Sequence, residues 1–167
     1  MRMPPRVVVR KSTFFDAQFE KLRERTGDFQ RTVLSEAEDM LENLHLPTLL
    51  VHPKTRLEAP GVGKSRIYDL TGVHRLKRGF HPKLKHHGLR LFYIWARDGV
   101  AGEDDEVIRV VALEFGARNP GRPDDAYTEF GERLQRGYHD RYFVLLGLRH
   151  AYWKLGDAPV PVKGRAR

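Results

Sequence analysis

Two long apolar segments constrain the fold of this chain more than any other feature. Residues 89–96 and 107–115 are rich in the β-branched, aromatic and aliphatic residues that strands favour. The connection between them, residues 98–106, is acidic and contains glycine, as a hairpin loop does. The two segments therefore predict an antiparallel pair of strands.

The chain before this hairpin predicts one strand and two helices. Residues 6–10 are short, β-branched and preceded by two prolines, which indicates an opening strand. Thr13 and Asp16 have the spacing of a capping box and mark the start of a helix, and Asp28 can cap a second one. Both helices have an apolar stripe: Phe15, Phe19 and Leu22 in the first, and Phe29, Val33, Ala37, Met40, Leu41 and Leu44 in the second. The pattern is typical of an amphipathic αα-hairpin whose acidic residues form a solvated face.

The segment between the helices and the hairpin is less regular. Prolines and glycines make residues 47–64 an irregular connection. Residues 66–70 are a candidate strand that ends at Thr71 and Gly72. The basic, histidine-rich residues 73–87 receive no assignment.

Two helices are predicted after the hairpin. Asp124 or Asp125 caps the first, and apolar residues from Tyr138 to Tyr152 recur at the intervals of a second. The order β-α-α-β-β-β-α-α predicts the α+β class, with an N-terminal strand and αα-hairpin packed on a small antiparallel sheet and with C-terminal helices.

The length of 167 residues suits one domain. We expect a main domain over residues 1–137 and a helical extension over residues 138–155. Two prolines and three basic residues predict that the tail, residues 156–167, is disordered.

The positive charge is concentrated in one part of the chain. Lys and Arg number 30 against 22 Asp and Glu, a formal net charge of +8. The segment of residues 54–90 has ten basic residues and two acidic ones, so it accounts for the whole excess. Arg outnumbers Lys, and a guanidinium can bind phosphate in a bidentate way. We therefore expect a nucleic-acid surface that includes Lys54, Arg56, Lys64, Arg66, Arg75, Arg78, Lys83 and Lys85.

Composition argues against several other classes of protein. The chain has no cysteine, which excludes disulfides, thiolate zinc sites and a cysteine nucleophile. Purely apolar runs such as residues 142–146 are far shorter than the roughly 20 residues of a membrane helix. The first residues lack the features of a signal peptide, so we expect a cytoplasmic protein without a membrane partner.

Two arginines interrupt the apolar strands. A charged residue at a mostly apolar strand position must be paired or must face a site. Arg90 lies at the start of its strand beside the basic segment, and a site is as plausible there as an ion pair. For Arg109 we favour an ion-paired or solvent-facing position.

The histidines suggest proton transfer more than metal binding. The spacing of His81, His86 and His87 matches no zinc pattern and no carboxylate lies nearby in the sequence, so we expect no metal cofactor. A histidine titrates near neutral pH and can act as a general acid or base. His74 and His81 are candidates by their location in the basic segment.

The order of elements resembles the RelE/ParE superfamily of bacterial toxins over about residues 6–135. Residues 89–93, Leu-Arg-Leu-Phe-Tyr, resemble the arginine-containing third strand of that family. Residues 110–118 resemble its last strand, which ends in a basic residue, and residues 124–127 resemble the Asp/Glu-x-Tyr sequence that follows. The long connection and the residues after about 137 extend beyond the usual family length.

The resemblance implies a toxin of a toxin–antitoxin system that cleaves mRNA without a metal, often on the ribosome, and is inhibited by an antitoxin protein. It implies that Arg90 and Arg118 bind the phosphate and that Lys54, Lys77 or His81 transfers a proton. Tyr127 would stack on a base, assist proton transfer, or simply pack its helix.

Other functions are open at this stage. The same basic surface suits a non-catalytic nucleic-acid-binding module. Some superfamily members instead inhibit a protein target such as DNA gyrase, and the Tyr138–Tyr152 region could form such a contact.

Overall fold

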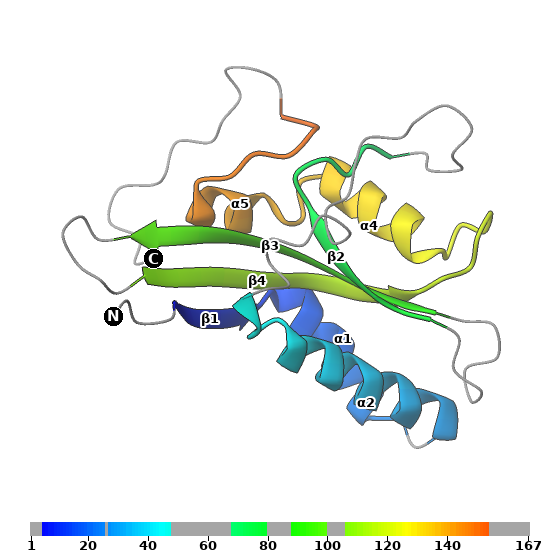
Figure 1. Ribbon diagram of the computed structural model, residues 1–167. Helices are drawn as coiled ribbons and strands as arrows, with labels where there is room; N and C mark the ends of the chain where they lie inside the picture. Colours follow the sequence, from blue (N-terminus) through cyan, green and yellow to red (C-terminus); the bar gives the residue numbers. More distant parts are fainter. Residues whose placement is uncertain (1–4, 26, 48–67, 80–87, 100–105, 154–167) are drawn as a thin grey trace.

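A computed structural model describes residues 5–25, 27–47, 68–79, 88–99 and 106–153. They form a four-stranded sheet with helices on both of its faces (Figure 1). The α+β class predicted from the sequence is confirmed.

The sheet has the strand order β1-β4-β3-β2. β2 (His74–Arg78), β3 (Leu89–Gly99) and β4 (Glu106–Ala117) are antiparallel neighbours, so the predicted hairpin is confirmed. β1 (Arg6–Lys11) pairs with β4 in parallel, which makes the sheet mixed. β1 is therefore one edge of the sheet and β2 is the other.

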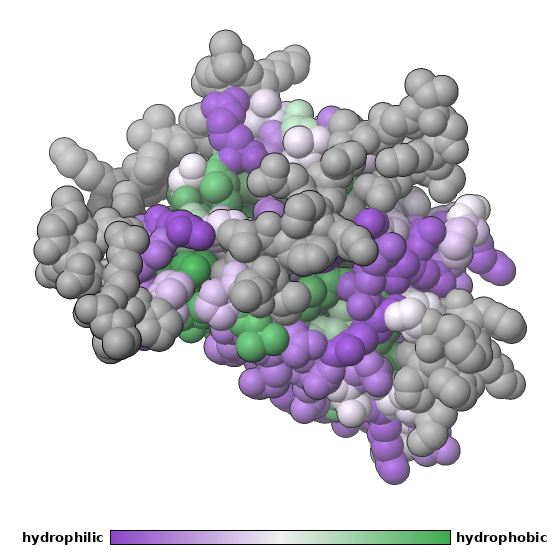
Figure 2. All heavy atoms as spheres, in the orientation of Figure 1, coloured by the Kyte–Doolittle hydropathy of each residue, from purple (hydrophilic) through white to green (hydrophobic). Residues whose placement is uncertain are grey.

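Each face of the sheet carries two of the described helices. α1 (Thr13–Arg23) and α2 (Asp28–Asn43) pack on one face, as the predicted αα-hairpin. α4 (Ala126–Gln135) and α5 (Asp140–Leu146) pack on the other (Figure 1). Hydrophilic side chains gather over the outward surface of α2 in the lower part of Figure 2, in agreement with a solvated acidic face.

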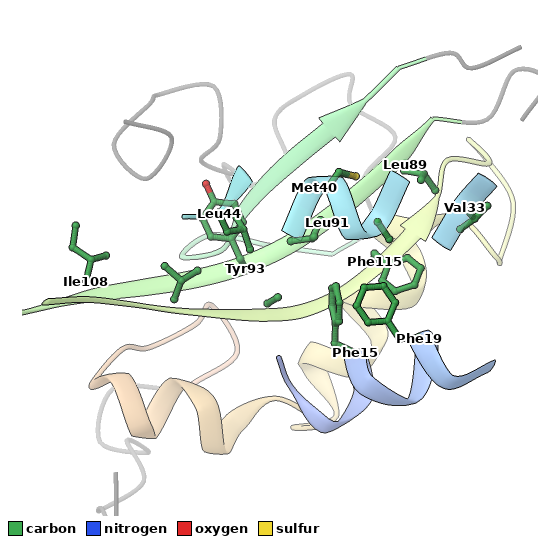
Figure 3. Packing of buried hydrophobic residues seen from close by; sticks show 13 residues of the cluster. Phe15, Phe19, Val33, Met40, Leu44, Leu89, Leu91, Tyr93, Ile108 and Phe115 are labelled. Atoms are coloured by element: carbon green, nitrogen blue, oxygen red, sulfur yellow. The ribbon is translucent and has the colours of Figure 1, made fainter. Parts of the chain in front are cut away.

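The core between α1, α2 and the sheet is centred on three aromatic rings (Figure 3). The Phe15 ring lies 4.8 Å from that of Phe19 and 5.1 Å from that of Phe115, both edge to face. Such pairs stabilise a core by about 0.5–1.5 kcal/mol beyond the area that they bury. The apolar stripe of α2 supplies the buried residues Val33, Ala37, Met40 and Leu44.

The second core lies between the sheet, α4 and α5. Phe92 of β3 stacks on Phe130 of α4 with 4.2 Å between the ring centroids. Phe143 and Leu146 of α5 are buried in the same cluster, and Trp153 packs against it. The described residues after 137 thus share a core with α4.

The prediction of a strand at residues 66–70 is wrong for the part that the structure describes. Residues 68–70 are not in a strand, and the strand, β2, begins four residues later at His74. β2 was not identified because its sequence, His-Arg-Leu-Lys-Arg, has one apolar residue. Leu76 packs on the first core while Arg75 and Lys77 point to the opposite face, opposite Phe92 and Arg90.

Both predicted N-caps of the αα-hairpin shift by one residue. Ser12, not Thr13, caps α1: its buried Oγ accepts from the Phe15 amide at 2.9 Å and donates to the Leu113 carbonyl at 2.5 Å. Gly27 precedes α2, and Asp28 lies in its first turn, where a carboxylate favours the helix dipole.

The last helix is shorter than its apolar pattern predicts. α5 ends at Leu146 and is capped by Gly147, whose φ of 67° is the left-handed conformation that terminates many helices. The chain then folds back, so that the Tyr152 hydroxyl accepts a hydrogen bond from the Asp69 amide at 2.7 Å. The predicted tail, residues 156–167, lies outside the described residues.

Two glycines allow α4 to approach its neighbours closely. A Cβ at Gly116 of β4 would lie 3.1 Å from the Cβ of Ala126, at the start of α4. A Cβ at Gly131 would lie 2.4 Å from the side chain of Tyr68. This close packing places the first turn of α4, which contains Tyr127, over the start of β3 and the end of β4.

Candidate functional site

Basic side chains from three strand regions converge on one tyrosine at the start of α4. Arg90 of β3 lies opposite Lys77 of β2 on one side and opposite Gly116 of β4 on the other. Arg75 lies two residues before Lys77, so it shares the same face of the sheet. Arg118 directly follows β4.

The side chain of Tyr127 organises these arginines. Its hydroxyl accepts a hydrogen bond from Nε of Arg90 at 3.0 Å and another from Nη1 of Arg75. The guanidinium carbons of Arg118, Arg75 and Arg90 lie 4.7, 5.5 and 5.9 Å from the centre of its ring. Distances below about 6 Å are those of cation–π contacts. We call Arg75, Arg90, Arg118 and Tyr127 the arginine cluster.

The backbone also holds Arg90. Its Nη1 donates to the Leu89 carbonyl at 3.0 Å and to the Arg78 carbonyl at 3.4 Å. A Cβ at Gly88 would lie 2.7 Å from that Arg78 oxygen and 3.1 Å from Nη1 of Arg90. Glycine at this position therefore leaves the space that the Arg90 side chain occupies.

Asp125 fixes Arg118. It caps α4, and its carboxylate accepts from the amides of Asn119 at 2.7 Å and Tyr127 at 3.2 Å. The same carboxylate binds Nη1 of Arg118 at 2.6 Å. The sequence offers Asp124 or Asp125 as the cap of this helix, and the structure confirms Asp125.

The arginine cluster is electrostatically suited to an anion. Three guanidiniums lie around one ring, and one of them, that of Arg118, forms an ion pair with Asp125. Guanidiniums present fixed donors that match phosphate oxygens. Arg118 keeps 23% of its side chain exposed, whereas Tyr127 is 6% exposed. A ligand would thus meet the arginines, with the tyrosine ring beneath them.

Of the residues predicted to be catalytic, the structure brings three together, namely Arg90, Arg118 and Tyr127. Lys77 is exposed and shares the face of Arg90. Arg75, which the sequence suggested only for nucleic-acid binding, is part of the cluster. His81, Lys54, Arg56, Lys64, Arg66, Lys83 and Lys85 lie outside the described residues.

Two other arginines belong elsewhere. Arg78, a predicted nucleic-acid contact, lies on the α2 face, where its guanidinium pairs with Asp39 and lies 3.7 Å from Glu36. Arg109 pairs with Asp98 at 2.7 Å, which confirms the ion-paired position expected for it.

Sequence reasoning missed a buried polar group under α4. Glu114 binds Arg133 with two hydrogen bonds from Nε at 3.1 Å and one from Nη2 at 2.6 Å, and it lies 2.6 Å from Nε2 of His139. An extra residue in β4, opposite the Phe92–Tyr93 step of β3, turns Glu114 toward α4. Its signal in the sequence is a lone acid within an apolar strand.

The Glu114 group is a structural ion pair. Burial alone lowers the pKa of Arg133, but the hydrogen bonds and the charge of Glu114 more than offset it and raise the pKa above its usual value. The guanidinium therefore stays charged, and its carbon lies 4.3 Å from the centre of the Phe14 ring. The group ties α1, β4 and α4 together.

In the described part of the chain, no cluster of three or more His, Asp or Glu side chains is arranged to bind a metal ion. None of the helices in this part combines the length and the apolar character needed to cross a bilayer.

Comparisons of this chain with protein-family models, with curated proteins and with solved structures give no match.

Proposed function

We propose that this protein binds single-stranded RNA through the arginine cluster and cleaves it as a RelE-like, metal-independent endoribonuclease. The observation that supports the proposal is the convergence of Arg75, Arg90 and Arg118 on the Tyr127 side chain. The resemblance of residues 89–93 and 110–118 to RelE/ParE strands points the same way. Such a toxin would act on mRNA in the cytoplasm, on or off the ribosome, under the control of an antitoxin protein.

The cleavage reaction needs a base, an acid and cations near the phosphate, and this chain contains candidates for each. The 2′-hydroxyl loses its proton to a base, its oxygen forms a bond to the adjacent phosphorus, and the bond from phosphorus to the 5′-oxygen breaks as that oxygen gains a proton. The guanidiniums stabilise the charge that develops on the phosphoryl oxygens, which is usually the largest contribution. The acid and base add about 10²–10⁴-fold.

The residues of the arginine cluster have distinct roles in this reaction. Arg90 and Arg118 bind the phosphate, and Arg75 is a third cation beside them. The low exposure of Tyr127 supports a positioning role, in which its hydroxyl orients Arg75 and Arg90, over stacking on a base. For proton transfer, Lys77 is exposed beside Arg90, and Lys54 and His81 are further candidates from the sequence.

A cleavage assay tests the proposal. Purified protein is incubated with mRNA in EDTA, with and without translating ribosomes, and the ends of the products are analysed. We expect 2′,3′-cyclic phosphate and 5′-hydroxyl ends, and a loss of about 10²–10³-fold in rate for Arg90→Ala or Arg118→Ala. Arg97→Ala is the matched control, because Arg97 is an exposed arginine on the same strand that pairs with Glu106.

A non-catalytic RNA-binding module is the second candidate. It is favoured by the burial of Tyr127, which leaves this side chain little access to a substrate. It predicts salt-dependent RNA binding that Arg90→Ala weakens, without any cleavage under either condition. Absence of both binding and cleavage would contradict both candidates.

A further inference from the structure

A second basic surface lies at the other end of β4, away from the arginine cluster. A cavity of about 190 Å³ opens there between β1, β4 and α5. One side of the cavity is lined by β1, through Arg6, Val8 and Arg10. The other walls include Arg109 of β4 and Leu145 and Leu146 of α5. It combines an apolar floor with cationic walls.

The backbone of β1 borders this cavity. β1 is the last strand of the order β1-β4-β3-β2, and no other strand among the described residues pairs with its outer side (Figure 1). The Ser12 amide donates to the Ala112 carbonyl of β4 at 2.8 Å. In a parallel pair the backbone groups of alternate residues point to the same side, so those of Val7 and Val9 point outward. No described strand pairs with these outward groups.

On the face of β1 that borders the cavity, a cationic, an apolar and a second cationic side chain follow one another. Arg6 and Arg10 are exposed, and neither forms an ion pair with a residue that the structure describes. Val8 lies between them and is 36% exposed, one of the few large exposed hydrophobic residues of the described chain. Arg109, by contrast, is paired with Asp98.

We propose that β1 binds an extended acidic segment of a partner protein, which adds a strand to this edge of the sheet. Strand addition uses main-chain hydrogen bonds for affinity and the alternating side chains for specificity. The segment would carry an acidic, an apolar and a second acidic residue at alternate positions. The acidic residues would face Arg6 and Arg10, and the apolar one would enter the cavity beside Val8.

Charge disfavours a second copy of this chain as the occupant. Antiparallel pairing of two β1 strands about Val8 would put Arg6 of each copy opposite Arg10 of the other, on one face. Like charges directly opposite each other destabilise a strand pair. An acidic partner replaces that repulsion with attraction.

Binding of two synthetic peptides tests the proposal. The first is fluorescein-labelled Ser-Glu-Thr-Val-Thr-Glu-Ser, whose two carboxylates lie on the same side of a strand as the valine. The second, Ser-Thr-Glu-Val-Glu-Thr-Ser, has the same composition, but its carboxylates point to the side opposite the valine. We expect the second peptide to bind the full chain at least about tenfold more weakly.

Variants identify the surface. The double variant Arg6→Glu, Arg10→Glu is expected to weaken binding of the first peptide at least about tenfold. The control, Arg25→Glu with Arg31→Glu, reverses two exposed arginines near the junction of α1 and α2 and leaves binding unchanged. Circular dichroism and urea denaturation verify that both double variants are folded.

Three results would overturn the proposal: equal binding of the two peptides, no effect of the β1 double variant, or no peptide binding at all. Light scattering adds a fourth, since a dimer that Arg6→Glu and Arg10→Glu abolish would identify a second copy as the occupant. RNA cleavage is unaffected by these variants, because the two surfaces lie at opposite ends of β4. The peptide proposal and the proposed function can therefore fail separately.

Discussion

The Tyr127 hydroxyl accepts a hydrogen bond from Nε of Arg90 at 3.0 Å, across 37 positions of sequence. This bond joins the first turn of α4 to the start of β3, where the cationic residues of the sheet are concentrated. Together with the Leu89 and Arg78 carbonyls, which accept from Nη1, it orients the guanidinium of Arg90. Because Arg90 is already oriented before a ligand binds, the entropic cost of binding is lower.

Removal of this hydroxyl is expected to weaken RNA binding. Tyr127→Phe keeps the ring but removes the acceptor for Arg75 and Arg90. A lost hydrogen bond of this kind corresponds to about 0.5–1.5 kcal/mol, or about 2- to 13-fold in affinity. Fluorescence anisotropy with a labelled single-stranded RNA measures the change.

Tyr138→Phe is the control for this substitution, because Tyr138 is 56% exposed and lies outside the arginine cluster. Its RNA affinity is expected to equal that of the wild type. Equal affinity of the Tyr127→Phe variant would show that the hydroxyl does not position the arginines for binding.

Asp125 is expected to contribute strongly to stability. Asp125→Ala removes the cap of α4 together with the acceptor for Arg118 and the Asn119 amide. A lost cap costs about 0.5–2 kcal/mol, and the unpaired groups add to it. We expect urea denaturation to give a free energy of unfolding about 1–3 kcal/mol lower. Asp124→Ala, at an exposed neighbour, is the control and should change it by less than about 0.5 kcal/mol.

Substitution of the buried Glu114 is expected to lower the free energy of unfolding further. Glu114→Ala leaves Arg133 and the fully buried His139 without their shared partner. Breaking a buried ion pair from one side costs about 3–5 kcal/mol. The exposed pair of Glu132 with Arg136 is the comparison, and Glu132→Ala is expected to cost less than about 1 kcal/mol. Similar losses in the two variants would argue against a structural role for Glu114.

Tyr142 gives the chain a pH-dependent contribution at alkaline pH. Burial raises its pKa, but hydrogen bonds with Thr13 and Arg141 more than offset this, so the pKa in the folded state is below the usual value of 10.0. A group with a lowered folded pKa stabilises the protein once it is ionised, and this contribution disappears as pH falls through the folded pKa.

The comparison with Tyr142→Phe isolates that contribution. The difference in unfolding free energy between wild type and variant is expected to grow in favour of the wild type as pH rises toward and past 10. Urea denaturation at several values between about pH 8 and 11 measures it. A difference that stays constant with pH would refute the expected ionisation.

The sequence predicts those parts of the fold where a local pattern is strong. The hairpin of β3 and β4 and the apolar stripe of α2 follow from composition and spacing alone. β2 could not be identified, since it is an edge strand with a single apolar residue whose place depends on pairing with β3. The end of α5 depends on Gly147, whose left-handed conformation no periodicity indicates.

The same distinction applies to the candidate site. Arg90 was noticeable as a charge within an apolar strand. The participation of Arg75 depends on the register between β2 and β3, which brings it opposite Phe92 and within reach of Tyr127. Glu114 reaches α4 because β4 has an extra residue there, a feature that tertiary packing decides.

The salt dependence of RNA binding tests the central claim most directly. Each phosphate contact with single-stranded RNA contributes about 0.7 to the slope of log affinity against log salt concentration. The triple variant Arg75→Ala, Arg90→Ala, Arg118→Ala is therefore expected to reduce that slope by about 2. The control, with Arg25, Arg31 and Arg136 changed to alanine, removes the same charge and is expected to keep the slope. If the two triple variants reduce it equally, the arginine cluster is not the site at which this protein binds RNA.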